Sequence, residues 1–386
     1  MSTEYVPAAE IRPETFTSRA SDHVQRGIQR GRELATGIAS AITGYRRYFE
    51  VLSISEADVR AAAASSHARL QAWSPVAAEE VAAVAEGAKI PVGELMEVIA
   101  RTEIMTLAPA SATECSTVSF TRPGGSLAAQ NWDWAADFST LWHINDVGAV
   151  PGQLRHVGIA EYGMLGKIGL NEAGVGVLLN ILKHEGDEAG GVPIHMILER
   201  VLSTARTLEE ALGIIHSAPT TSSSIITVVT ADEVVQVEIA NAEKRERRAG
   251  DSGAVPGADS GSGFLLHTNH FLHLDLIPGS LELNATSTSR ARQAHLEQRL
   301  EDFSIQAEAS GGAEASGGPE STADLIDILT TGPGEAPVSC TPEPGAAYGD
   351  RSATLVTVQI DPARKQIDLA PGSPADGMQG NRRYQL

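Results

Sequence analysis

The chain changes character near residue 113, and this change constrains the fold more than any other feature of the sequence. Residues 18–107 are rich in alanine, glutamate, arginine and leucine, with apolar residues at helical spacing. After Thr113, short runs of β-branched and apolar residues alternate with turns of glycine, asparagine and aspartate. A helical stretch followed by strands interleaved with helices predicts a layered α/β body that carries a helical N-terminal segment.

Local signals give provisional element boundaries. Ser55 precedes Glu56 and Asp58, so its hydroxyl can cap a helix there, and Pro75 and Pro91 predict further helix starts or breaks. Apolar runs predict strands at residues 116–121, 166–170, 175–180, 225–230, 234–239 and 354–360. Helical spacing predicts helices at residues 193–203, 207–217, 287–303 and 321–329. Glycine- and serine-rich residues 250–263 and 307–320 are expected to be mobile surface loops.

Charge and cysteine content narrow the classes of protein. Forty-nine acidic and 29 basic residues give a net charge of −20, which argues against nucleic acid or anionic lipid as a partner. The first residues lack a basic patch followed by an apolar run, and no apolar stretch could span a bilayer, so neither secretion nor a membrane is indicated. The two cysteines, Cys115 and Cys340, cannot form a disulfide framework, and we expect a reducing cytoplasm. A bridge between them is left open, and it would consume the Cys115 thiol.

Cys115 lies where the helical segment meets the first strand signal. An isolated cysteine is more often a small buried hydrophobe, and that interpretation is the alternative here. A thiol has a pKa of about 8.5 and needs a base to attack well near neutral pH. A free α-amine on the same residue can be that base if the chain is cut between Glu114 and Cys115. Such a cut would leave fragments 1–114 and 115–386.

Two polar clusters follow in the predicted strand region. Trp132, Asp133 and Trp134 form one, and they either line a site or anchor the core beside a capping aspartate. The other contains His267 and Asn269, whose side-chain amide could donate to a developing oxyanion. Histidines at 267, 270 and 273 also admit a metal site, but no HExxH pattern or paired cysteines support it, so no metal or cofactor is predicted.

Arg351 directly precedes the last predicted strand. It is either a solvated charge, or it orients Asp133 or holds a substrate carboxylate. The glycines between residues 163 and 176 lack the strand, loop and helix order of a phosphate-binding loop, and tight turns between strands explain them better.

Together and in this order, six motifs resemble the acyl-coenzyme A:6-aminopenicillanic acid acyltransferase family of cysteine N-terminal nucleophile hydrolases. They are ECS at 114–116, QNWDW at 130–134, GMLGKIGLN at 163–171, HTNHF at 267–271, RSATL at 351–355 and PGSP at 371–374. The resemblance implies an α+β fold, an αββα sandwich of two stacked sheets between helical layers, and self-cleavage of an inactive precursor before the cysteine.

Carried over to this chain, the resemblance implies Cys115 as nucleophile, Asp133 as a polar partner, Asn269 as oxyanion donor and Arg351 as an organising cation. Trp132, Trp134 and His267 are expected to face the substrate. The leading hypothesis is hydrolysis of a small N-acyl amide by a heterodimer of the two fragments. The alternatives are acyl transfer from a thioester or amide to an amine, and a non-enzymatic binding protein that is never processed.

Overall fold

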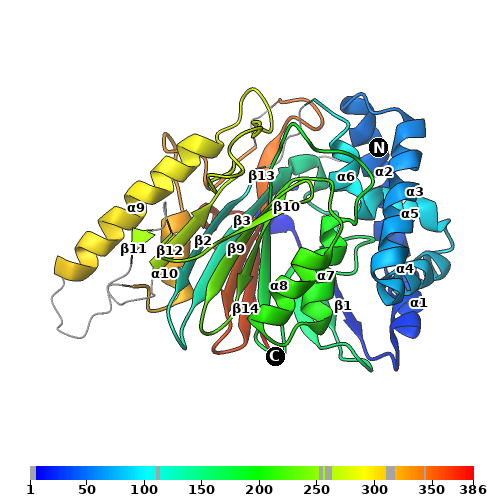
Figure 1. The fold of residues 1–386 in the computed structure, drawn as a ribbon, viewed down its shortest axis with the longest axis horizontal. Coiled ribbons are helices and arrows are strands. Elements are labelled where there is room, and N and C mark those ends of the chain that lie inside the picture. Colours follow the sequence, from blue (N-terminus) through cyan, green and yellow to red (C-terminus); the bar gives the residue numbers. More distant parts are fainter. Residues whose placement is uncertain (1–5, 110–113, 252–254, 257–262, 310–317, 343–344) are drawn as a thin grey trace.

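The computed structural model describes residues 6–109, 114–251, 255–256, 263–309, 318–342 and 345–386, which form two stacked β-sheets between helical layers (Figure 1). The eight-stranded sheet has, in spatial order, β1 (Thr15–Ser18), β4 (Trp142–Val147), β5 (His156–Glu161), β6 (Ile168–Asn171), β7 (Gly176–Ile181), β8 (Ser224–Val229), β9 (Val234–Ala240) and β10 (Glu243–Arg247). The seven-stranded sheet has β11 (Val255–Pro256), β12 (Gly263–His267), β2 (Ser116–Thr121), β3 (Leu127–Ala135), β13 (Ser352–Asp361), β14 (Gln366–Pro371) and β15 (Arg382–Gln385).

Helices cover the outer faces of both sheets. On the eight-stranded sheet, α7 (Ile194–Thr204) packs on β6 and β7, and α8 (Leu208–Ser217) packs on β8. On the other sheet, α9 (Ser289–Ala309) lies against β12, and α10 (Thr322–Leu329) lies against β2, β3 and β13. Strands β2 and β14 contact the facing sheet directly. The predicted αββα sandwich is therefore confirmed.

The N-terminal segment gathers at one end of the sandwich (Figure 1). Its helices are α1 (His23–Glu33), α2 (Ala35–Val51), α3 (Glu56–Trp73), α4 (Pro75–Ala88), α5 (Val92–Ile99) and α6 (Arg101–Met105). The Ser55 hydroxyl accepts from the Asp58 amide, and helices begin at Pro75 and directly after Pro91, as predicted. Strand β1, which the sequence did not indicate, pairs in parallel with β4 and ties this segment to the eight-stranded sheet.

Most predicted strands and helices of the sandwich are present within a few residues of their expected bounds. Gly174 lies in the turn between β6 and β7 with a φ of 87°, which supports the turn interpretation of this glycine. The predicted loops 250–263 and 307–320 fall largely outside the described residues. Their described parts contain β11 and the end of α9. Short 3₁₀ turns lie at Ala8–Glu10, Ala136–Phe138 and Pro374–Asp376.

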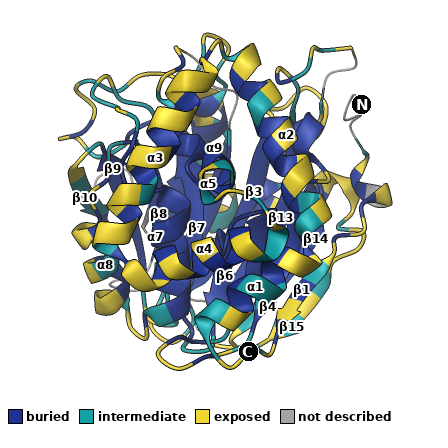
Figure 2. Cartoon of the chain, turned by 90° about the vertical axis from the view of Figure 1, so that its right-hand side faces the viewer, coloured by how far each residue is buried: buried dark blue, intermediate teal, exposed yellow. Residues whose placement is uncertain are grey.

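The strands are buried almost throughout, while the helices turn exposed faces outward (Figure 2). Antiparallel pairing sets the polar clusters side by side, because His267 is opposite Thr117 and Ser116 is opposite Asn131. Asp133 is opposite Thr354 on β13. Residues from four sequence regions therefore meet around the start of β2. Among the described helices, none combines the length and apolarity needed to cross a lipid bilayer.

Candidate functional site

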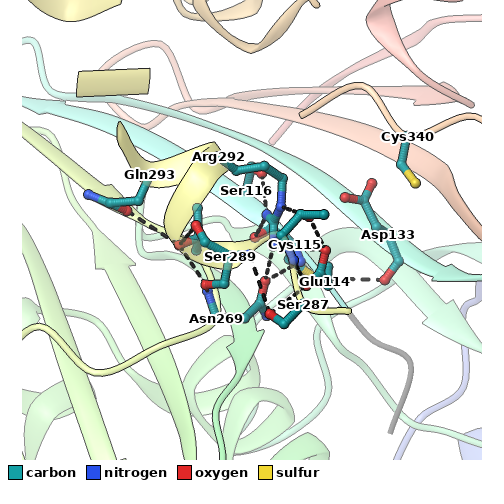
Figure 3. Close-up of polar contacts among 12 residues, drawn as sticks. Glu114, Cys115, Ser116, Asp133, Asn269, Ser287, Ser289, Arg292, Gln293 and Cys340 are labelled. Carbon is teal, nitrogen blue, oxygen red and sulfur yellow. Dashed lines mark hydrogen bonds and ion pairs between the residues drawn. The ribbon is translucent and has the colours of Figure 1, made fainter. Parts of the chain in front are cut away.

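The backbone N–H and the backbone carbonyl of Cys115 are both hydrogen-bonded to side chains from other parts of the chain. The residue is 3% exposed and directly precedes β2. Its backbone N–H donates to Asn269 Oδ1 at 2.8 Å. Its carbonyl oxygen accepts from Asn180 Nδ2 at 3.1 Å and from Arg292 Nη1 at 2.8 Å. These contacts fix the nitrogen that a cut before Cys115 would turn into an α-amine (Figure 3).

Arg292 organises this site from α9, although the sequence analysis did not select it. The side chain is fully buried and also donates to Ser116 Oγ at 2.7 Å and to Asn269 Oδ1 at 2.8 Å. Since Cys115 and Arg292 both donate to Asn269 Oδ1, the amide can have only one orientation. Its Nδ2 then donates to the Ile181 carbonyl at 2.9 Å, which leaves one N–H of that amide for a further acceptor.

Burial controls the proton affinity of the reactive groups. It raises the pKa of the Cys115 thiol to about 12, and Asp133 adds to the rise. It also raises the pKa of Asp133 well above its usual value. Asp133 Oδ1 accepts from Thr354 Oγ1 at 2.5 Å, while its buried Oδ2 has no hydrogen-bond partner among the residues that the structure describes. The Cys115 thiol of the uncut chain therefore stays protonated near neutral pH, and Asp133 Oδ2 is free to exchange a proton.

A cavity of about 380 Å³ is lined by Glu114, the residue before Cys115, whereas Cys115 itself is not among the lining residues. Tyr48 and Val51 of α2 line it together with Leu52, the residue that follows this helix. The other lining residues are mostly polar and are Glu114, Asn284, Thr286, Thr288, Pro337, Cys340, Gly349, Asp350 and Ser352. The N-terminal segment and the sandwich thus share the walls of one cavity, which is large enough for a small acyl substrate.

The two tryptophans are not among the residues that line this cavity. The ring of Trp132 lies 3.6 Å from Lys167 Nζ, and the ring of Trp134 lies 4.1 Å from the Arg101 guanidinium carbon. Trp134 also packs edge-on against Tyr48, which does line the cavity. Any effect of Trp134 on a substrate in this cavity would therefore pass through Tyr48.

His267 and Arg351 each pair with a carboxylate rather than with Cys115 or Asp133. His267 is fully buried, and its Nε2 lies 2.9 Å from Glu238 Oε1 on the facing sheet. Arg351 pairs with Asp137 through Nη2, and no contact with Asp133 is present among the described residues. Of the predicted catalytic residues, Cys115, Asp133 and Asn269 come together, whereas Arg351 pairs elsewhere.

A buried charge network lies beneath Trp132 and was also not foreseen. Glu161 Oε1 is 2.6 Å from Lys167 Nζ and 2.7 Å from Arg101 Nη2, and all three side chains are at most 3% exposed. Burial alone would raise the pKa of Glu161, but the two cations outweigh it and lower that pKa. Burial lowers the pKa of Lys167 to about 7. No cluster of three or more metal-binding side chains occurs in the described parts of the chain.

This arrangement defines a class. Two stacked sheets between helical layers, with a cysteine at the start of a central strand, are the architecture of the N-terminal nucleophile hydrolases. The family model for acyl-coenzyme A:6-aminopenicillanic acid acyl-transferase matches residues 120–376, and the chain belongs to that family.

Three individual proteins show how far the similarity in sequence and in fold extends. The 40 kDa form of acyl-coenzyme A:6-aminopenicillanic-acid-acyltransferase from Emericella nidulans is 31% identical over 242 residues, which are 62% of this chain and 63% of that protein. An N-acylethanolamine-hydrolyzing acid amidase ortholog from Caenorhabditis elegans aligns with a TM-score of 0.43 and 14% identity, over 70% of this chain and 100% of that one. Penicillin V acylase from Agrobacterium tumefaciens aligns with a TM-score of 0.36 and 13% identity, over 67% of this chain and 83% of that one.

Proposed function

We propose that this chain is a self-processing amidohydrolase that cleaves a small N-acyl amide through an acyl-enzyme on Cys115. Family membership supports an enzyme of acyl transfer or amide cleavage. The observation that carries the finer proposal is the clamp on Cys115, whose nitrogen and carbonyl are both bonded to buried side chains. Buried backbone groups need partners at any residue, but here the partners are side chains from three separate segments, and one of them holds the nitrogen of the bond that would be cut.

Maturation begins with the thiol of the uncut chain. Sγ attacks the Glu114 carbonyl carbon, the C–N bond breaks, and the Cys115 nitrogen leaves as an amine that receives the thiol proton. Asp133, with a raised pKa and an unpartnered Oδ2, is suited to carry this proton. Water then hydrolyses the thioester, which frees the thiol and leaves a carboxylate on Glu114. The two fragments stay together as a heterodimer because they share one core.

Turnover uses the new amine as the base. An α-amine has a pKa of about 7.7 to 8.0, so near neutral pH much more of it is available than of the buried thiolate. Asn269 Oδ1 holds the amine, and the second N–H of its Nδ2 is available to donate to the oxyanion of a bound amide. The substrate amine leaves after protonation, and water releases the acid from the thioester.

Acyl transfer to an amine is the second candidate, and the name of the Emericella nidulans relative favours it. Coenzyme A thioesters carry several phosphates that arginine or lysine usually binds. Among the described residues that line the cavity, none is a lysine or an arginine. The cavity therefore fits a small amide better than a coenzyme A ester. Acylation of added amines, measured beside release of free acid, separates the two reactions.

The maturation step can be tested by intact mass and N-terminal sequencing of the purified protein. The wild-type protein should separate into two fragments under denaturing conditions, and the larger should begin Cys-Ser-Thr-Val. Cys115→Ala should remain one inactive chain, whereas Cys340→Ala, the matched cysteine control, should be cut and active. An uncut wild-type chain without amidase activity would instead support a non-enzymatic binding protein.

A further inference from the structure

We propose that the Glu114 side chain positions the bond that the chain cuts, as an anchor on the acyl side of that bond. The inference rests on the proposed self-cleavage and adds a residue that acts on the maturation step. Glu114 becomes the last residue of the N-terminal fragment, so it leaves the reacting bond once that bond is cut. It is a positioning residue, because its carboxylate touches neither the thiol nor the leaving nitrogen.

The Glu114 carboxylate lies in a cradle formed by the two residues that precede α9 and by Arg292 of that helix (Figure 3). Oε1 accepts from Ser287 Oγ and from the Thr288 backbone N–H, each at 2.8 Å. Oε2 accepts from Thr288 Oγ1 and lies 3.4 Å from Arg292 Nη2. The Glu114 side chain is 16% exposed. A carboxylate at a helix N-terminus beside a buried guanidinium is favoured by both the helix dipole and the ion pair.

The cradle and the Cys115 clamp share Arg292. The same guanidinium bonds to the Cys115 carbonyl at 2.8 Å and to Asn269 Oδ1 at 2.8 Å, on the amine side of the bond. Glu114 therefore fixes the acyl half of the peptide to the group that fixes the amine half. Rotation about the Glu114 backbone would carry its carbonyl carbon away from Sγ, and the anchored side chain opposes that rotation. Such restraint of both reacting partners is an established source of rate acceleration.

The anchor should act on the first attack rather than on thioester hydrolysis. In the first step, Sγ bonds to the Glu114 carbonyl carbon and the peptide C–N bond breaks, with the thiol proton passing to the Cys115 nitrogen. In the second step, water adds to the thioester and the C–S bond breaks. Hydroxylamine can replace water in that second step, because it cleaves thioesters rapidly, but it cannot speed an attack that has not occurred.

The test follows cleavage of the newly synthesised full-length chain in a cell-free translation system, by intact mass over time. Glu114→Ala and Glu114→Asp should slow cleavage by about tenfold or more, because alanine has no carboxylate and the aspartate carboxylate is too short to reach the cradle. A tenfold change corresponds to about 1.4 kcal/mol in the activation barrier. Glu114→Gln keeps the length and one acceptor and should lie between them and the wild type. Glu301→Gln, an exposed glutamate on α9, is the control and should cut at the wild-type rate.

Two further measurements separate positioning from a general loss of structure. Hydroxylamine should leave the Glu114→Ala rate low, since the first attack limits it. Thermal unfolding of Glu114→Ala in a Cys115→Ala background should show a protein that is fully folded at the assay temperature. The inference would be overturned if Glu114→Ala were cleaved at the wild-type rate, or if hydroxylamine restored its cleavage rate fully. It would also be overturned if the fraction of Glu114→Ala that is unfolded accounted for its loss of cleavage. An uncut wild type would instead refute the proposed self-cleavage itself.

Discussion

Replacing Arg292 by methionine should lower the free energy of unfolding by about 3–5 kcal/mol and abolish self-cleavage. Methionine keeps an unbranched, flexible side chain, although a shorter one, and removes every donor. The Cys115 carbonyl, Ser116 Oγ and Asn269 Oδ1 would each lose a hydrogen bond of 2.7 to 2.8 Å inside the protein. Glu114 would lose its cation.

The magnitude follows from what stays buried after the change. Hydrogen bonds to charged groups contribute about 1.5–3 kcal/mol each, so three of them suggest a loss well above 4 kcal/mol. Simple addition overstates the effect, because Asn180 still donates to the Cys115 carbonyl and methionine does not pay the desolvation cost of a guanidinium. The Glu114 pair adds little, since it is 3.4 Å long and partly reached by water. Reducing the sum of the three hydrogen bonds for these two effects leaves an expected cost of about 3–5 kcal/mol.

Urea unfolding in a Cys115→Ala background measures this cost on one uncut chain. Arg290→Met is the matched control, because that side chain is 66% exposed on the same helix and should change stability by less than about 1 kcal/mol. The two variants should share the wild-type dependence on urea concentration if both remain folded. An Arg292→Met protein as stable as the Arg290→Met protein would show that the guanidinium does not hold the site together.

Further predictions concern the nucleophile's partner, the buried network and pH. Asn269→Ala should lower amide turnover by roughly a hundredfold, measured per mole of processed enzyme, and an unchanged rate would remove its proposed role. Glu161→Gln should cost about 3–5 kcal/mol in urea unfolding, because Arg101 and Lys167 lose their shared carboxylate, and a cost below 1 kcal/mol would contradict that. Burial, together with the charges of Arg26 and Arg30, lowers the pKa of His156 to about 3 in the folded protein. In the unfolded chain the same histidine has its ordinary pKa of about 6.5, so below that pH the unfolded chain binds more protons than the folded one. The stability of the fold therefore falls as the pH drops. Between pH 7 and 5 this histidine should cost about 2 kcal/mol, and His156→Gln should flatten that slope in thermal unfolding measured at these two pH values.

Local apolar runs predicted a layered α/β body and six of its strands, whereas the αββα sandwich was implied by the family resemblance. Strands β4, β5, β12 and β14 were not among the predicted runs. Strand β2 begins and ends at the residues predicted, and β7, β8 and β9 differ by one residue at their ends. Strand β10 was missed, since its sequence Glu-Lys-Arg-Glu-Arg is that of a charged edge strand rather than of a core strand. Strand β1 was missed because four residues carry too little pattern, and only pairing with β4 makes them a strand.

The site was predictable only where the ordered motifs pointed to it. Cys115, Asp133 and Asn269 lie in such motifs, and they meet in the structure. Arg292 was hidden, because α9 has charged residues on all sides and Arg290 and Arg292 look alike in sequence. Only the packing of α9 on β12 exposes one and buries the other. Arg351 shows the reverse case, where a motif residue pairs with Asp137 instead of joining the site.

The origin of these contacts also bears on when the chain could cut itself. Cys115 is hydrogen-bonded to Asn180 on β7, Asn269 just after β12 and Arg292 on α9, which are 65, 154 and 177 residues away in sequence. Closing such long loops costs entropy that only the assembled sandwich repays. An unfolded chain has a thiol with an ordinary pKa, but nothing in it holds the Glu114 carbonyl against Sγ. If Cys115 cuts the chain as proposed, cleavage must therefore follow folding, and the cut fraction of a newly made sample should never exceed its folded fraction.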